Sequence, residues 1–176
     1  MWGAQEPGGD PKSPFSKGGF RGIFRGELNI PKALVAYASR TGETQSIADY
    51  IAEGIRFTGA EARVVEAAQL KKEEDLEGYD AYVFGSATYH GEMMPAVKTL
   101  LFLAEKANLE KKIGASFGAF GWSGEAPDRI YDTMRHIFRM EMVGSPLRLK
   151  STLLQGGPKM AQDYGREIGK RLSKVS

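Results

Sequence analysis

From Pro31 to the end of the chain, short apolar runs alternate with segments whose apolar residues recur every three or four positions. Short apolar runs predict buried strands, and the longer recurrence predicts helices with one apolar face. The predicted strands cover Ala33–Ala38, Ala62–Glu66, Tyr82–Phe84 and Ile113–Ala119, with a fifth within Glu141–Leu149. Because short, mainly apolar strands alternate with helices, the pattern predicts an α/β fold with helices on both faces of a parallel sheet.

The predicted helices each carry one apolar stripe. The first runs from about Gly42 to Phe57, and a later one begins near Pro95, which suits a first turn because its missing N–H needs no partner there. Three stripes follow from the spacing: Ile47, Ile51 and Ile55; then Ile130, Met134, Ile137 and Phe138; and last Met160, Tyr164, Ile168 and Leu172.

The first 30 residues lack this pattern. Glycine and proline make up a third of residues 1–30, and neither a helical nor a strand period is present. Such a composition predicts a disordered tail, so we place a single folded domain at residues 31–176.

Composition excludes several kinds of chemistry. The chain of 176 residues contains no cysteine and two histidines, His90 and His136, so thiol catalysis and thiolate metal sites are ruled out and no metal site is predicted. The formal charge of +2 gives no indication of nucleic-acid binding. No apolar run approaches the roughly 18 residues that a membrane span needs, and Met1–Asp10 does not resemble a secretory signal. We therefore expect a soluble cytoplasmic protein.

The most informative segment is Ser39–Thr44, which lies between the first strand and the first helix. A helix N-terminus presents backbone N–H groups without partners, and its dipole favours an anion. Ser39, Thr41 and Thr44 add three hydroxyl groups, and Gly42 permits close backbone approach. This segment therefore predicts a phosphate-binding loop.

Two further loops follow the third and fourth predicted strands. The second loop is Ser86–Gly91 and the third is Ala119–Gly124, and both combine aromatic residues, glycine and small polar groups. Open α/β sheets bind ligands beyond the carboxyl ends of their strands. Aromatic side chains there can stack on the flat ring of a ligand, and backbone N–H and C=O groups can form hydrogen bonds with its polar edge. A phosphate loop beside two such loops predicts a mononucleotide site.

The three loops together resemble those of the flavodoxin-like family. Ser39–Thr44 is similar to the flavodoxin phosphate loop, and the second and third loops are similar to those of the flavodoxin domain of flavodiiron proteins. The chain as a whole resembles a stand-alone short-chain flavodoxin. The resemblance covers roughly Lys32 to Leu172. It implies a three-layer sandwich whose five-stranded parallel sheet has the order 2-1-3-4-5, and it implies FMN as cofactor.

The resemblance also implies roles for individual residues. The first loop would hold the phosphate, the second would lie along the isoalloxazine edge, and the third would contact the pyrimidine side, with Tyr89 and Trp122 as the main stacking candidates. The predicted cofactor-binding residues are Ser39, Arg40, Thr41, Gly42, Glu43, Thr44, Ser86, Ala87, Thr88, Tyr89, His90, Gly91, Ala119, Phe120, Gly121, Trp122, Ser123 and Gly124. No side chain is assigned a catalytic role.

The sequence departs from the family in three ways. Arg40 places a cation inside the phosphate loop, and His90–Gly91 replaces the asparagine-rich continuation of the flavodiiron second loop. The iron domain of flavodiiron proteins has no counterpart in these 176 residues, so oxygen or nitric oxide reduction by this chain alone is not supported.

The function predicted first is electron transfer between redox partners of the ferredoxin, rubredoxin or reductase kind, by a monomer or weak dimer. The alternative is an FMN-dependent quinone reductase or a protoporphyrinogen-oxidase-like oxidoreductase. A third hypothesis is a binding module that has lost the flavin. The sequence lacks a Gly-x-Gly-x-x-Gly fingerprint, so a dedicated dinucleotide site has little support.

Overall fold

The computed structural model describes residues 29–175. Nearly all of the predicted tail lies outside these residues, so the disorder of residues 1–30 and the domain boundary at residue 31 remain predictions.

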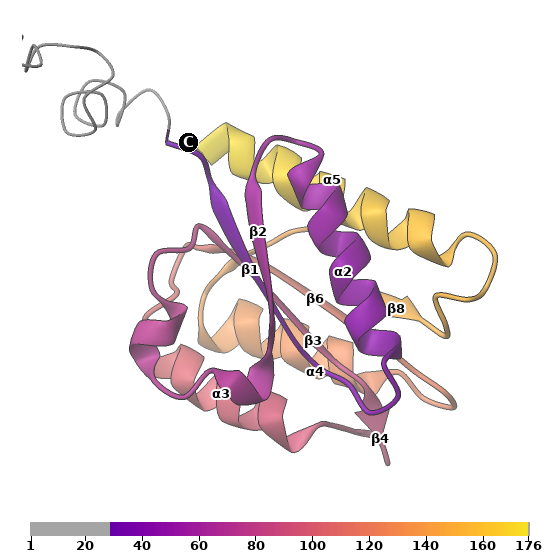
Figure 1. Ribbon diagram of the computed structural model, residues 1–176. Helices are drawn as coiled ribbons and strands as arrows, with labels where there is room; N and C mark the ends of the chain where they lie inside the picture. The colour runs from indigo at the N-terminus through magenta and orange to yellow at the C-terminus, as the bar shows by residue number, and fades with distance from the viewer. Residues whose placement is uncertain (1–28, 176) are drawn as a thin grey trace, which may run out of the picture. The chain divides into compact units, whose positions relative to one another are not determined.

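One parallel sheet forms the centre of the fold (Figure 1). Its order is β2-β1-β3-β6, and two short strands, β7 and β8, both pair with the outer side of β6. The bounds are Lys32–Ala38 for β1, Glu61–Glu66 for β2, Ala81–Ser86 for β3, Ile113–Ala119 for β6, Glu141–Met142 for β7 and Leu147–Leu149 for β8. The predicted order is confirmed, with the fifth position divided between two strands.

Gly144 and Pro146 lie within the interruption between β7 and β8. Gly144 has a φ of +59°, a left-handed conformation that breaks the extended backbone. Pro146 has no N–H to donate to the sheet. These two residues account for the division of the last strand.

Helices cover both faces of the sheet (Figure 1). The helices α2 (Glu43–Arg56) and α5 (Gly157–Val175) pack on one face, and α3 (Pro95–Lys106) and α4 (Glu125–Asp132) pack on the other. Each face has its own buried apolar cluster, which confirms the three-layer arrangement. The remaining elements are the 3₁₀ turns η1 (Ala67–Gln69) and η2 (Glu73–Leu76), the π-helical turn η3 (Thr133–Ile137), and the hairpin of β4 (Thr88–Tyr89) and β5 (Glu92–Met93).

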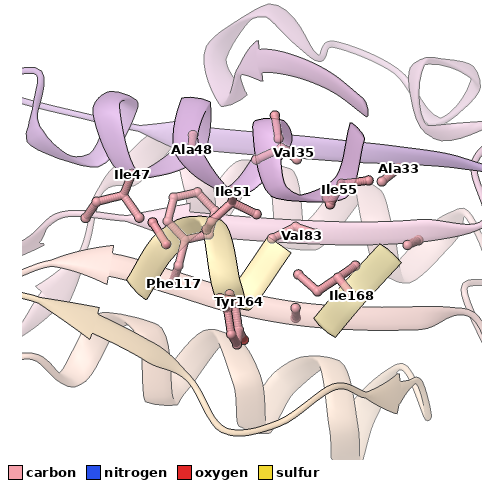
Figure 2. Close-up of a cluster of buried hydrophobic side chains, with 14 of the residues drawn as sticks. Ala33, Val35, Ile47, Ala48, Ile51, Ile55, Val83, Phe117, Tyr164 and Ile168 are labelled. Carbon is pink, nitrogen blue, oxygen red and sulfur yellow. The ribbon is translucent and has the colours of Figure 1, made fainter. Parts of the chain in front are cut away.

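The predicted apolar face of α2 is buried against the sheet. Ile47, Ile51 and Ile55 have no exposed surface, and Figure 2 shows them among Val35, Phe117 and other side chains of β1, β3, β6 and α5. Tyr164 of α5 reaches into this cluster, where its hydroxyl donates to the carbonyl of Ser116 at 3.1 Å.

The two helices of this face approach each other through glycine. A Cβ atom on Gly165 would lie 2.0 Å from the carbonyl oxygen of Ile51, and one on Gly54 would lie 2.0 Å from that of Gln162. No real side chain fits at these distances. The close packing of α2 on α5 therefore depends on the absence of a side chain at both positions.

Two predicted stripes differ from the structure at single residues. Ile137 is 61% exposed, because the N–H of Phe138 donates to the carbonyl of Thr133 and this wider π-type turn rotates Ile137 out of the stripe. In α5, Met160 is exposed and the adjacent Ala161 is buried instead. The remaining members of both stripes are buried as predicted.

Replacing Gly165 with alanine tests the helix packing. We expect Gly165→Ala to lower the free energy of unfolding by about 2 kcal/mol or more, because overpacking outweighs the gain of roughly 1 kcal/mol in helix propensity. Urea denaturation measures this change. Lys170→Ala, at an exposed position of the same helix, is the control and should change stability by less than about 0.5 kcal/mol. Equal stability of the two variants would contradict the close packing.

Candidate functional site

The three predicted loops lie at one edge of the sheet, because β1, β3 and β6 are adjacent and parallel. The second loop is joined to the first turn of α4, which directly follows the third loop, since the N–H of Ala126 donates to the hydroxyl of Thr88 at 3.2 Å. The first and second are joined by Arg40, whose guanidinium carbon lies 4.3 Å from the centre of the Tyr89 ring. The fold thus assembles the three segments into one site.

The phosphate loop has the form that an anion site requires. Gly42 has a φ of +90°, which a residue with a side chain would adopt only under strain, and its N–H donates to the hydroxyl of Ser39 at 2.9 Å. The helix α2 begins at the next residue, so the first N–H groups of the helix have no carbonyl partner within it.

Thr44 provides an independent test of whether this loop fits a phosphate. Its side chain is completely buried, and its Oγ1 has no hydrogen-bond partner within residues 29–175. A buried hydroxyl without a partner costs about 1–3 kcal/mol, so such groups are rare unless a ligand completes them. The chemistry of the loop therefore fits the predicted phosphate.

Glu43, which the sequence analysis placed among the cofactor-binding residues, has its carboxylate bound to Ser151 and Thr152. Its Oε2 accepts hydrogen bonds from the N–H of Thr152 at 3.1 Å, from the Thr152 hydroxyl at 3.2 Å and from the Ser151 hydroxyl at 3.3 Å. The carboxylate is thus directed to the loop after β8. Sequence reasoning missed Ser151 and Thr152, although a pair of hydroxyl residues following a strand was a signal that could have indicated them.

The second loop contains the short hairpin of β4 and β5. Thr88 pairs with Met93 and Tyr89 with Glu92, and the two turn residues, His90 and Gly91, both have positive φ, at 50° and 73°. This backbone geometry is typical of the tight turns that join antiparallel strands.

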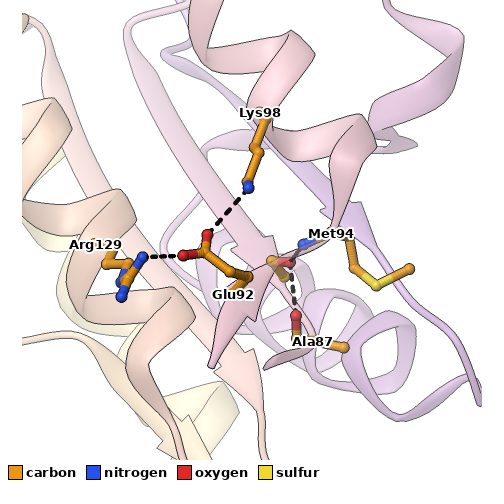
Figure 3. A network of polar contacts seen from close by, with 6 residues as sticks. Ala87, Glu92, Met94, Lys98 and Arg129 are labelled. Carbon is orange, nitrogen blue, oxygen red and sulfur yellow. Dashed lines mark hydrogen bonds and ion pairs between the residues drawn. The ribbon is translucent and has the colours of Figure 1, made fainter. Parts of the chain in front are cut away.

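Ser86 connects this hairpin to the end of β3. It is fully buried, its hydroxyl donates to the carbonyl of Ala87 at 2.8 Å, and it accepts from the N–H of Met94 at 2.8 Å (Figure 3). The hydroxyls of Ser86 and Thr88 are therefore used to build the loop. The exposed side chains at its tip are Tyr89 and His90.

Ion pairs hold the far strand of the hairpin. Glu92 pairs with Lys98 of α3 at 3.1 Å and with Arg129 of α4 (Figure 3). The hydrogen bond from Lys98, assisted by Arg129, holds the pKa of Glu92 below its usual range. The hairpin is thus attached to both helices on its side of the sheet.

The third loop presents Trp122 to solvent. Its N-terminal end is fixed to β8, because the N–H of Phe120 donates to the carbonyl of Leu149 at 3.1 Å. The Ser123 hydroxyl donates to Glu125 and holds the pKa of that carboxyl below its usual range. Trp122 itself is fully exposed, which leaves a large aromatic surface available for stacking.

A pocket of about 340 Å³ lies between the second and third loops. It is lined by Thr88, Tyr89, His90, Gly91, Gly121, Trp122 and Ser123. Two exposed aromatic side chains and glycine residues therefore line a space at the same edge of the sheet as the phosphate loop, and this arrangement fits a flat ring.

Comparison with known proteins agrees with this geometry. A model of the flavodoxin domain family matches residues 34–150. The putative diflavin flavoprotein A 5 of Nostoc sp. is 34% identical over 112 residues, which cover 62% of this chain and 20% of that protein. The anaerobic nitric oxide reductase flavorubredoxin of Escherichia coli is 27% identical over 146 residues, which cover 80% of this chain and 30% of that protein.

A solved flavodoxin from the domain Archaea is similar over its whole length. It aligns with a TM-score of 0.74 and 28% sequence identity, covering 81% of this chain and 99% of that one. The present chain, by contrast, spans less than a third of the length of the two curated relatives.

Sheet, phosphate loop and aromatic pocket define an α/β protein that binds a phosphorylated aromatic mononucleotide. The chain belongs to the flavodoxin domain family. This membership confirms the predicted flavodoxin-like fold, the FMN cofactor and the electron-transfer class. Within residues 29–175, no three or more His, Asp or Glu side chains are placed so that they could hold a metal ion together, and no helix is long and apolar enough to cross a membrane.

Replacing Thr44 with valine separates phosphate binding from protein stability. We expect Thr44→Val to raise the free energy of unfolding of the ligand-free protein by about 1 kcal/mol, because it removes a buried hydroxyl that has no partner. The same change should weaken FMN binding by roughly 10- to 100-fold, since a hydrogen bond to a charged group is lost.

Urea denaturation and fluorescence titration measure these two effects. Riboflavin, which lacks the phosphate, is the control ligand, and its affinity should not change. Equal loss of FMN and riboflavin affinity would contradict a phosphate role for Thr44.

Proposed function

We propose that this chain is an electron carrier that holds FMN across the three loops and exchanges electrons with redox proteins at the edge of the flavin. The observation that carries this proposal is the aromatic pocket between the second and third loops, which lies at the same edge of the sheet as the phosphate loop and is lined by the exposed side chains of Tyr89 and Trp122. FMN supplies one- and two-electron redox chemistry when bound.

The protein's own residues divide the task of binding. The unpartnered hydroxyl of Thr44 and the N–H groups at the start of α2 hold the phosphate, with Ser39 and Thr41 beside them. Tyr89 and Trp122 provide the stacking surfaces, and the peptide groups of the second and third loops contact the polar edges of the ring. Ser86 and Thr88 keep the second loop in place.

The partners that we propose are ferredoxin-, rubredoxin- or reductase-like proteins. Similarity to a flavorubredoxin supports a partner of the rubredoxin kind. An exposed tryptophan at the site suits brief docking, because aromatic residues are enriched in the cores of protein interfaces. The cytoplasmic location and the monomeric or weakly dimeric state remain predictions from the sequence.

Reconstitution tests this proposal. We expect the purified chain to bind one FMN and to quench its fluorescence, and the reduced protein to pass electrons to a rubredoxin or a ferredoxin in stopped-flow measurements. Sustained turnover of NAD(P)H with a quinone would favour the reductase alternative, and oxidation of protoporphyrinogen would favour the oxidase alternative. A folded chain that refuses FMN would support the third hypothesis, a module without flavin.

Trp122→Ala should weaken FMN binding about fivefold or more, because an aromatic stack contributes about 1 kcal/mol beyond the area that it buries. The flavin absorption spectrum should shift as well, since the ring loses an aromatic neighbour. Phe102→Ala removes another exposed aromatic side chain, on α3 and outside the pocket, and is the matched control. Equal effects of the two substitutions would argue against stacking by Trp122.

A further inference from the structure

Arg40 lies inside the phosphate loop, yet its side chain contacts the second loop. The guanidinium carbon is 4.3 Å from the centre of the Tyr89 ring, within the range of a cation–π interaction. No hydrogen bond or ion pair involves this side chain among the residues that the structure describes. The stack on Tyr89 is therefore the contact that links Arg40 to the second loop.

Tyr89 depends on such contacts for its position. It is 46% exposed, it lines the pocket, and its ring meets the ring of His90 edge-on at a centroid distance of 4.2 Å. The hairpin that carries it has two residues in each strand, and a hairpin of this size has little stability of its own. The ring is therefore held by its neighbours, with Arg40 supplying the contact from the phosphate loop.

A guanidinium group can serve two neighbours at once. Its flat face stacks on an aromatic ring, while its N–H groups point outward in the plane and donate hydrogen bonds to anions. Lysine has the charge without the flat face, so it can attract a phosphate but cannot form the same stack. The two roles can consequently be separated by substitution.

We propose that Arg40 is a positioning residue that couples the phosphate end of the flavin site to its ring end, by fixing Tyr89 against the pocket. This inference rests on the proposed function, because it concerns the binding of the same cofactor. Arg40 is thus expected to strengthen binding of the isoalloxazine ring even in a flavin that lacks the phosphate.

A double-mutant cycle with two ligands tests the coupling. Arg40→Lys should weaken riboflavin and FMN alike by about two- to fivefold, the effect of one exposed cation–π contact on the ring platform. In a Tyr89→Leu background, Arg40→Lys should leave riboflavin affinity unchanged, because the stack is already absent. Flavin fluorescence titration gives all the dissociation constants.

Arg166→Lys is the matched control. The guanidinium of Arg166 stacks on Phe57 at 4.9 Å, where α2 ends, so its replacement removes the same kind of contact away from the three loops. It should change neither flavin affinity. A measurement without flavin completes the test: in the ligand-free protein the side-chain protons of Arg40 should show ring-current NMR shifts that disappear in Tyr89→Leu.

Two results would overturn the inference and leave the proposed function intact. One is an Arg40→Lys protein that binds riboflavin as tightly as the wild type. The other is an equal effect of Arg40→Lys with and without the Tyr89 ring, which would indicate that the two residues act independently. A wild-type chain that binds neither flavin would overturn the proposed function itself, and the coupling with it.

Discussion

The parallel pairing of β1, β3 and β6 is the constraint on which the site depends. Since the three strands run in the same direction side by side, the loops that follow them are brought to one edge of the sheet. Close packing maintains this arrangement. A Cβ atom on Gly118 would lie 2.3 Å from the carbonyl oxygen of Ser86, so the ends of β3 and β6 approach as closely as they do because glycine occupies that position.

Much of the fold follows from local sequence patterns, and the exceptions have local or long-range causes. Apolar runs and helical spacing sufficed for a parallel sheet covered by helices and for most of the buried faces of α2 and α5, because burial acts on every strand and helix in the same way. The order of the strands came from the resemblance of the three loops to a known family. The predicted burial of Ile137 was wrong, because one π-type turn changes the rotation per residue along the helix. Its spacing in the sequence contains no sign of that turn.

The position of the phosphate loop was predictable, but the direction of its side chains was not. A strand that ends in hydroxyl and glycine residues before a helix indicates an anion site wherever it occurs. The contact of Glu43 with Thr152 joins residues 109 positions apart, and the stack of Arg40 on Tyr89 joins two separate loops. Such pairings depend on tertiary geometry, so inspection of either segment alone could not show them.

The glycine contact between α2 and α5 has a consequence for how the site responds to its ligand. The phosphate loop opens directly into α2, whose interlocked packing leaves little room for displacement. The second loop, in contrast, contains a hairpin with two residues in each strand, and the third loop carries a fully exposed tryptophan. Under the proposed function, the phosphate would be held at the closely packed end of the site, and the ring would lie at the end that is built from short loops.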